Sequence, residues 1–450
     1  MRASSGACIL LVVLCAITLC AQTNQGSVTD AGGQPSSAAP LTITLQDALQ
    51  RARQNNPQYR AAATDFALAK ENRVQSRAAL LPSVNYNTQI LYTEGNNTPT
   101  GRFIASNAVH EYAAQGNVHQ EISLENFAGY RRASAAQTLA QARAEIAARG
   151  LVVTVVQAYY GFAVAQRKYA TAQRAAGEAQ RFLDISQKLE KGGEVAHSDS
   201  IKAQIQYQQQ ERELQDAELG MNRSRLELAV LLFPDFNQDF AIVDDLQPPE
   251  PLPAFPEIQA AAARNNPELR AAVAALQEAR HEVTAAWNGF LPSLSFDYFY
   301  GIDSSRFAVH QFDPSSGQVL RNLGYAATAT LQLPVWNWGS NRSKLKQADL
   351  RQQQAHVELS FAQRRLLSDL QAFYDEAQTA RTELDSLSES AALAAESSRL
   401  TILRYQAGEA TVLEVVDAQN TLTSARNAFD DGQARYRLAM ANLQTLTGTL

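Results

Sequence analysis

The chain has 450 residues, of which 45% are hydrophobic and 19% are charged, and its formal net charge is −6 at pH 7. This composition excludes a disordered tail and a bundle of membrane-spanning helices. Because no basic excess or basic cluster is present, the sequence predicts no nucleic-acid partner. The three cysteines, Cys8, Cys15 and Cys20, all lie in the first twenty residues, which excludes a disulfide framework, a cysteine-rich metal site and a catalytic thiol.

Residues 1–21 have the features of a secretory signal peptide. Arg2 gives a weakly charged start, and the apolar run Ala7–Leu19 has the length of a signal core but is too short to span a bilayer. Cleavage after Cys20 or after Ala21 remains open, and so does lipidation of Cys20. Residues 22–41 are polar and predict a disordered linker. No later apolar run approaches the roughly 20 residues of a spanning helix, so we expect an exported protein that enters a membrane, if at all, without helices.

The sequence contains an internal duplication. Asn55-Asn56-Pro57 recurs as Asn265-Asn266-Pro267 at an offset of 210 residues, and Gly193-Glu194 recurs as Gly408-Glu409 at an offset of 215. Repeats of about 200 residues are far longer than the units of solenoid proteins. The matches therefore predict a duplicated half-molecule with pseudo-twofold similarity inside one chain.

The two predicted copies are residues 42–233 and 257–450, and each holds a helix, two strands and a long helical hairpin. The linker between them, residues 234–256, contains six of the fifteen prolines. We expect the return helix before this linker, about 198–233, to stack end to end on the helix after it, about 257–290. The linker would then form an equatorial belt around the middle of the helices.

Each copy has two segments in which apolar and polar residues alternate, the pattern of a strand with one apolar face. We predict strands at about 83–94 and 113–125 in the first copy, and at about 293–303 and 323–334 in the second; Phe299 breaks the alternation. Strands of about 11 residues can cross a bilayer when tilted. The alternative is two soluble hairpins with one face on a core, but long helices leave no element to cover four apolar faces.

Both strand pairs lead into long segments without proline, at about 130–190 and 340–406, that are rich in good helix formers. Each ends at a glycine turn, so we predict antiparallel helical hairpins with tips at 191–197 and 406–411 that pack as coiled coils. A scaffolding coiled coil is the alternative, which the signal peptide and the strands oppose. Four strands cannot close a membrane barrel, since the smallest barrels use about eight. Subunits must therefore share one, and two, three or four subunits remain possible.

The segment Arg404–Leu422, with the sequence RYQAGEATVLEVVDAQNTL, resembles the second hairpin tip of the TolC-like outer membrane efflux family. The Asn-Pro helix starts, the Leu-Leu-Pro junction at 80–82 and the ending at 446–450 are also similar to that family. The resemblance covers about 42–450. It implies an α+β membrane protein: a homotrimer with a 12-stranded outer membrane β-barrel, four strands per chain, continued by an α-helical coiled-coil tunnel across the periplasm.

The resemblance further implies a function, which is transport without chemistry. The chain would be the outer membrane channel subunit of a tripartite efflux or type I secretion system, a passive exit duct through outer membrane lipid. Its partners would be a periplasmic adaptor protein and an inner-membrane pump of the RND or ABC type. The alternative is a periplasmic coiled-coil scaffold whose strands pack on partner proteins. The cargo, whether drug, metal, peptide or protein, is not given by the sequence.

By the same resemblance, Glu414 and Asp417 occupy the positions of two acidic residues of the periplasmic gate. Their spacing of three puts both on one helix face, and the alternative is a pair of solvated carboxylates at a helix start. Ala410 stands where some family members have an arginine, so a gate-locking salt bridge from that position is not expected. The tips that would dock the adaptor consist of Gly192, Gly193, Glu194, Gly408, Glu409 and Ala410.

Six aromatic residues lie where strands meet helices, and they would form a girdle at the periplasmic membrane interface or pack the junction. They are Phe127, Tyr130, Trp287, Phe290, Trp336 and Trp338. The six histidines have no metal-ligand spacing, and no phosphate loop, nucleophile elbow or catalytic carboxylate pair is present. The sequence therefore predicts a protein that is not an enzyme and that has no cofactor.

Overall fold

A computed structural model of the chain describes residues 41–92, 110–246, 251–305, 307–313 and 316–448. The predicted signal peptide and residues 22–40 of the predicted linker lie outside this range. The chain divides into two units, Met1–Leu41 and Thr42–Leu450, and the features below belong to the second.

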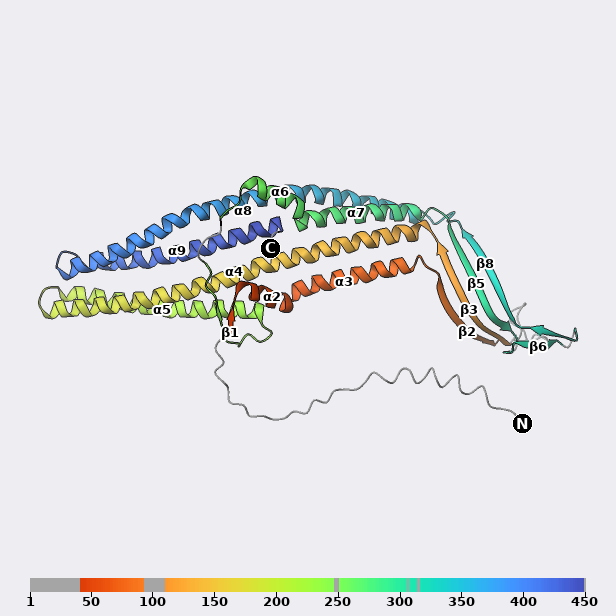
Figure 1. Ribbon diagram of the computed structural model, residues 1–450, viewed down its shortest axis with the longest axis horizontal. Helices are drawn as coiled ribbons and strands as arrows, with labels where there is room; N and C mark the ends of the chain where they lie inside the picture. The colour runs from red at the N-terminus through yellow and green to blue at the C-terminus, as the bar shows by residue number, and fades with distance from the viewer. Residues whose placement is uncertain (1–40, 93–109, 247–250, 306, 314–315, 449–450) are drawn as a thin grey trace, which may run out of the picture. The chain divides into compact units, whose positions relative to one another are not determined.

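The two copies of the repeat have the same order of elements (Figure 1). The first copy comprises α2 (Leu45–Asn55), α3 (Pro57–Ala78), β2 (Ser83–Tyr92), β3 (His110–Ile122), α4 (Leu124–Lys191) and α5 (His197–Leu232). The second comprises α6 (Phe255–Asn265), α7 (Pro267–Asn288), β5 (Ser293–Ser304), β8 (Leu323–Gln332), α8 (Ser340–Gln406) and α9 (Val412–Thr447). Two short two-stranded sheets are added, formed by β1 (Leu41–Ile43) with β4 (Phe240–Ile242) and by β6 (His310–Asp313) with β7 (Gln318–Arg321).

The repeated Asn-Asn-Pro motif breaks a helix in both copies. Asn56 and Asn266 are extended and accept a hydrogen bond from the third residue of the helix that follows, at 2.9 and 2.8 Å. Proline occupies the first helical position, where its missing N–H costs nothing, but it disfavours helical backbone in the residue before it. The single helix expected at about 257–290 is therefore wrong: α6 and α7 are separate helices.

The second predicted strand, about 113–125, is also placed too late. The strand β3 begins at His110 and ends at Ile122, and the Ser123 hydroxyl accepts a hydrogen bond from the Asn126 N–H at 3.1 Å. A serine in extended conformation is a good helix cap. The long helix α4 therefore starts at Leu124, earlier than the 130 expected from composition.

The sheet separates apolar from polar side chains. Its order is β2-β3-β5-β8, with every pair antiparallel. Residues opposite each other in such a sheet project to the same face. One row across the sheet reads Val84, Val118, Tyr298 and Ala327, and the adjacent row, on the other face, reads Asn85, Asn117, Phe299 and Ala326. The alternation predicted in each strand thus combines into one apolar face and one polar face.

The helix α4 is the central element of the helical layer, with contacts to α2, α3, α5, α7 and α9. Within the described residues it is also the one helix that is long and apolar enough to cross a membrane by length and composition, and 44% of that window is buried. The expectation that no later run is apolar enough is therefore wrong for α4. Its apolar side chains, such as Val155, Tyr159 and Phe162, lie in the main core with residues of α2, α5, β4 and α9.

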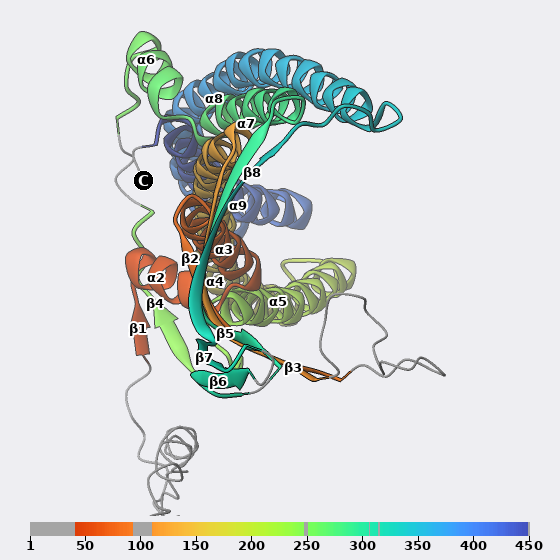
Figure 2. The same ribbon diagram turned by 90° about the vertical axis from the view of Figure 1, so that its right-hand side faces the viewer.

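Tyr159 ties the linker to this core. Its buried hydroxyl donates to the carbonyl of Val243 at 2.6 Å and lies 3.2 Å from the carbonyl of Ile43. Ile43 is the last residue of β1 and Val243 directly follows β4, so the hydroxyl connects the ends of the two strands. Burial raises the pKa of Tyr159 to about 12. In Figure 2, β1 and β4 lie beside α2, with α6 on the same side of the helices.

The return helices stack differently from the expectation. The Asn55 side chain donates to the carbonyl of Leu232, the last residue of α5, at 2.6 Å. The Asn265 side chain donates to the carbonyl of Thr447, the last residue of α9, at 3.2 Å. Each return helix therefore meets the short helices of its own copy, α5 with α2–α3 and α9 with α6–α7 (Figure 1). The last carbonyl groups of a helix have no donor within the helix, and these asparagines supply one to α5 and one to α9. The expected stacking of α5 on the helix after the linker is therefore wrong.

The two asparagines give a stability test. Asn55→Ala and Asn265→Ala should each lower the free energy of unfolding by about 1 kcal/mol, because a helix-end carbonyl loses its donor. Thermal unfolding of the purified protein, followed by circular dichroism, measures the effect. Gln54→Ala, an exposed neighbour in α2, is the control and should leave the melting temperature nearly unchanged. Equal melting temperatures for the asparagine variants and the control would contradict the role assigned to these bonds.

Candidate functional site

The tips of the two helical hairpins have the same backbone conformation. Gly193 and Gly408 both have positive φ, +76° and +75°, a conformation that only glycine adopts without strain. In each tip, the N–H of the glutamate after the glycine donates to the carbonyl five residues earlier, at 2.9 and 2.8 Å. This closes the helix end and satisfies its carbonyls. The repeat noticed in the sequence is therefore a repeated turn.

The predicted docking residues fall into two separate groups, one at each tip. Gly192, Gly193 and Glu194 are exposed between α4 and α5, and Gly408 and Glu409 are exposed between α8 and α9. Ala410 is half-buried and packs against the apolar cluster of the tip region. A protein that approaches the tips would therefore meet polar backbone and the two glutamates.

The two hairpins contact each other next to the tips. Phe182 of α4 packs edge-on against Tyr405 of α8, with ring centroids 5.0 Å apart, and Tyr405 reaches Ser186 through its hydroxyl at 3.1 Å. Further from the tips, the side chain of Gln206 in α5 donates to Asn420 in α9 at 2.9 Å. One protomer thus holds its two hairpins together without any partner chain.

Glu414 is the third residue of α9 and forms a capping box with Thr411. The Glu414 N–H donates to the Thr411 hydroxyl at 3.3 Å, and the Thr411 N–H donates to the Glu414 carboxylate at 3.2 Å. These hydrogen bonds, with Arg404 nearby, lower the pKa of Glu414. The helix-start alternative for this carboxylate is therefore realised in the structure, whatever its function in a gate.

Asp417 lies one turn further along the same exposed side of α9, opposite the buried Val412 and Val415. The structure therefore brings Glu414 and Asp417 to one solvent-facing surface. Their gate role stays a prediction.

Sequence reasoning missed Arg404. This arginine lies 3.5 Å from the Glu414 carboxylate and donates to the backbone carbonyl of Glu409 at 3.0 Å. It belongs to the end of α8, so it joins both sides of the turn. Arg404 thus brings a positive charge to Glu414 from the helix before the turn. It is part of the hairpin-tip motif, but the spacing of that motif does not show this contact.

The apolar face of the sheet is uncovered in the single chain. Val84, Tyr86 and Tyr325 are 75%, 72% and 75% exposed. The edge strands β2 and β8 each have only one neighbour in this sheet. A large exposed apolar face marks a surface for lipid or protein, and open edges are positions where further strands can pair.

The six aromatic residues all lie at the boundary between strands and helices, but they have different surroundings. Trp287 packs on Phe290 and Trp336 packs on Trp338, with centroids 5.8 and 5.9 Å apart. These four and Phe127 are exposed. Tyr130 instead lies under the guanidinium of Arg73, 5.9 Å from its ring, and packs the junction. The girdle remains a prediction for the other five, and Tyr130 fits the alternative.

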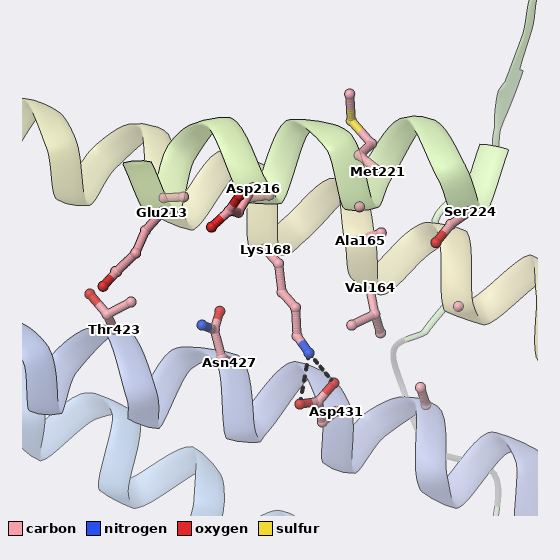
Figure 3. A pocket seen from close by; sticks show the side chains of 15 residues that line it. Val164, Ala165, Lys168, Glu213, Asp216, Met221, Ser224, Thr423, Asn427 and Asp431 are labelled. Atoms are coloured by element: carbon pink, nitrogen blue, oxygen red, sulfur yellow. Dashed lines mark hydrogen bonds and ion pairs between the residues drawn. The ribbon is translucent and has the colours of Figure 1, made fainter. Parts of the chain in front are cut away.

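An open groove of about 620 Å³ lies between α4, α5 and α9, away from the tips (Figure 3). Lys168 from α4 forms an ion pair with Asp431 from α9 at 2.7 Å, while Glu213 and Asp216 line the α5 side. The groove is therefore mainly acidic at its rim. Over the part of the chain that the structure describes, no three His, Cys, Asp or Glu side chains come together as a metal site.

The family description "Outer membrane efflux protein" matches residues 48–232 and 258–449, almost the whole of both copies. The chain belongs to the outer membrane efflux protein family. It is 25% identical over 429 residues to the alkaline protease secretion protein AprF of Pseudomonas aeruginosa, covering 91% of this chain and 85% of AprF. It is 24% identical over 428 residues to the outer membrane protein TolC of Vibrio cholerae, covering 92% of both.

Solved structures agree in fold. The Campylobacter jejuni CmeC outer membrane channel superposes with a TM-score of 0.76 at 17% identity, over 90% of this chain and 85% of CmeC. The family resemblance, the outer membrane location and the function in efflux that the sequence predicted are confirmed at family level. The family is one of transport proteins, not enzymes, and the scaffold alternative is not favoured.

The capping box gives a pH-dependent test of the second tip. Because the pKa of Glu414 is lowered from 4.5 in the folded chain, its contribution to stability is present above that value and is lost as the pH falls through the folded pKa. Glu414→Gln should speed hydrogen exchange at residues 408–417 roughly threefold at neutral pH. Below the folded pKa, the wild-type exchange rate, corrected for intrinsic chemistry, should approach that of the variant.

Glu409→Gln is the matched control, because Arg404 contacts the backbone carbonyl of Glu409 and not its carboxylate. Its exchange should equal that of the wild type. Because glutamine can still accept the hydrogen bond from the Thr411 N–H, the comparison isolates the charge of the carboxylate. If Glu414→Gln and Glu409→Gln exchange alike, this charge does not stabilise the tip.

Proposed function

We propose that three copies of this chain form one outer membrane channel, the exit duct of a tripartite efflux or type I secretion system. Each of these three subunits contributes four strands to a 12-stranded barrel and its hairpins to a tunnel. The tunnel meets a periplasmic adaptor and an inner-membrane pump. The observation that supports this is the four-stranded sheet with two open edges and two chemically different faces.

The open edges lead to a closed ring. Four strands are too few to close on themselves, since the smallest membrane barrels use about eight. If β8 of one subunit pairs with β2 of the next subunit, the contact is head-to-tail, and repeating it by rotation closes a ring. The polar faces then line the interior and the apolar faces meet lipid, so no backbone group is left unpaired in the hydrocarbon.

The helices next to the two edge strands also carry exposed apolar residues. α3 precedes the edge strand β2, and α8 follows the edge strand β8. Leu350, Val357 and Phe361 are exposed on α8 at spacings of seven and four, which keeps them on one face, the α8 edge. Leu68 and Val74 are exposed on α3. If β8 of one subunit pairs with β2 of the next, the α8 edge of the first subunit would pack against α3 of the second.

The tips of the tunnel would receive the adaptor. The six residues of the two tips end each hairpin in a turn whose backbone is fixed by its own hydrogen bonds. Fixed turns offer a partner a preformed surface and cost little to order. The five exposed aromatic residues at the strand–helix boundary would lie at the periplasmic interface of the membrane.

A charge at the α8 edge tests the shared assembly. Phe361→Asp should move most of the detergent-solubilised protein from trimer to smaller species, because the neighbour would bury an unpaired carboxylate. Gln363→Asp adds the same charge at an exposed position on the other side of α8. It should leave the trimer intact.

Blue-native electrophoresis of the outer membrane extract separates these outcomes, and circular dichroism verifies that both variants are folded. A wild-type protein that migrates as a monomer would overturn the proposed channel. A trimer that tolerates Phe361→Asp would place the interface elsewhere.

The gate is tested by conductance. If Glu414 and Asp417 line the narrow end, the double variant Glu414→Ala/Asp417→Ala should raise single-channel conductance in a planar bilayer and weaken cation selectivity. Thr411→Ala breaks the cap but keeps both charges, so it should change selectivity little.

The two variants also separate charge from helix fraying. A conductance rise in Thr411→Ala as large as in the double variant would show that the cap, not the pair of charges, holds the tip closed. Unchanged conductance and selectivity in both would remove these residues from the gate.

A further inference from the structure

Phe299 is the one phenylalanine, tyrosine or tryptophan on the polar face of β5. Along the same face of this strand it lies between Asp297 and Gly301, followed by Asp303. Across the sheet its neighbours are Asn117 and Ala326. The residue that broke the sequence alternation is thus a half-buried aromatic ring between two carboxylates, on the face opposite the apolar one.

The polar face has carboxylates but no permanent cation. The strands β2, β3, β5 and β8 contain no lysine or arginine. Their four carboxylates, Glu111, Glu121, Asp297 and Asp303, all project to the polar face. Histidine and glutamine orient two of them: His119 lies 2.7 Å from Asp297, and Gln115 donates to Asp303 at 3.0 Å.

The face is hollowed beside Phe299. An open cavity of about 450 Å³ is lined by Gln115, Phe299, Gly301, Asp303, Asn322 and Thr328, among others. Gly301 is required here, because a Cβ at this position would lie 2.2 Å from the backbone oxygen of Ala114. A side chain therefore cannot fill this part of the cavity.

The ring of Phe299 and the carboxylate of Asp303 both line this cavity. An aromatic ring with a carboxylate on the same surface suits a ligand that carries a positive charge and an apolar surface.

We propose that this hollow binds hydrophobic organic cations as they leave through the bore. The ring of Phe299 offers its face to the cation, and Asp297 and Asp303 supply the counter-charge above and below it. The inference rests on the proposed function, because it requires the polar faces to line the channel. It adds a preferred class of cargo, set by the barrel wall and independent of the periplasmic gate.

A cysteine opposite Phe299 reports on the site directly. Ala326→Cys places a thiol across from Phe299, and Cys20→Ala removes the native cysteine nearest the start of the mature chain. In trimers in lipid vesicles, a cationic methanethiosulfonate should label this thiol about tenfold faster than an anionic one of similar size. Asp297→Asn with Asp303→Asn should bring the two rates close together.

Protection measures binding. Tetraphenylphosphonium should slow labelling of the thiol several-fold, while tetraphenylborate, with the same shape and opposite charge, should not. Phe299→Leu should abolish the protection. Tyr298→Leu, the neighbouring aromatic on the apolar face, is the matched control and should keep it.

The outcomes separate the two proposals. If Ala326→Cys and Ala327→Cys, which projects to the opposite face, are labelled equally well, the polar face does not line an aqueous bore and the proposed function fails. If Ala326→Cys alone is labelled but both tetraphenyl ions protect equally or not at all, the channel stands. The cation site is then wrong.

Discussion

Backbone hydrogen bonding at the edges of the four-stranded sheet is the constraint on which the architecture depends. β2 and β8 each leave one row of N–H and C=O groups without a partner in this sheet. In hydrocarbon every such group costs several kcal/mol, and family membership places the protein in the outer membrane. A strand from another subunit at each edge, as proposed above, would pair these groups, and the helices that follow the strands would then be arranged in a ring as well.

The internal duplication gives both halves of the chain the same contact between helix ends, called the joint below. In both copies an asparagine at the end of a short helix donates to the last carbonyl of the return helix. The second joint is reinforced by Arg149 of α4, which donates to the carbonyl of Thr445 at 2.7 Å. Each hairpin is thus extended by helices of its own copy. The two copies are joined by the linker, by the pairing of β3 with β5, and by the contacts that α4 and α5 make with the second copy.

Periodicity was enough to predict the strands and their two faces, because the alternation of apolar and polar residues within one strand separates its faces. The long helices followed from their composition and the absence of proline. The helix break at Asn266-Pro267, the early start of α4 at Leu124 and the stacking of α5 depend on single polar side chains. The Asn56-Pro57 pair is typical of a helix start, and the same pair at Asn266-Pro267 predicts the break. The bonds from Asn55 and Asn265 join residues more than 170 positions apart, and no local pattern contains them.

The tip residues show the same limit at the candidate site. Thr411 and Glu414 form a recognisable capping signature, so the helix-start role of Glu414 could be read from the sequence. Its partner Arg404 could not, because that contact depends on how two antiparallel helices face each other across the turn. Local chemistry was predictable, and chemistry across the hairpin was not.

The interface between the two hairpins changes character along its length. Next to the tips it is apolar, with Phe182, Tyr405 and Val415 in one cluster. One turn beyond Val415, the buried side chain of Gln419 has neither amide atom paired within the described residues, and Gln206 bonds to Asn420. Polar contacts can be exchanged for water at a net cost of only about 1 kcal/mol each, whereas separating an apolar cluster exposes its whole surface. The apolar cluster beside the tips therefore holds the two hairpins together more strongly than the polar stretch around Gln419 does, and a protein that binds the tips acts next to the stronger of these two contacts.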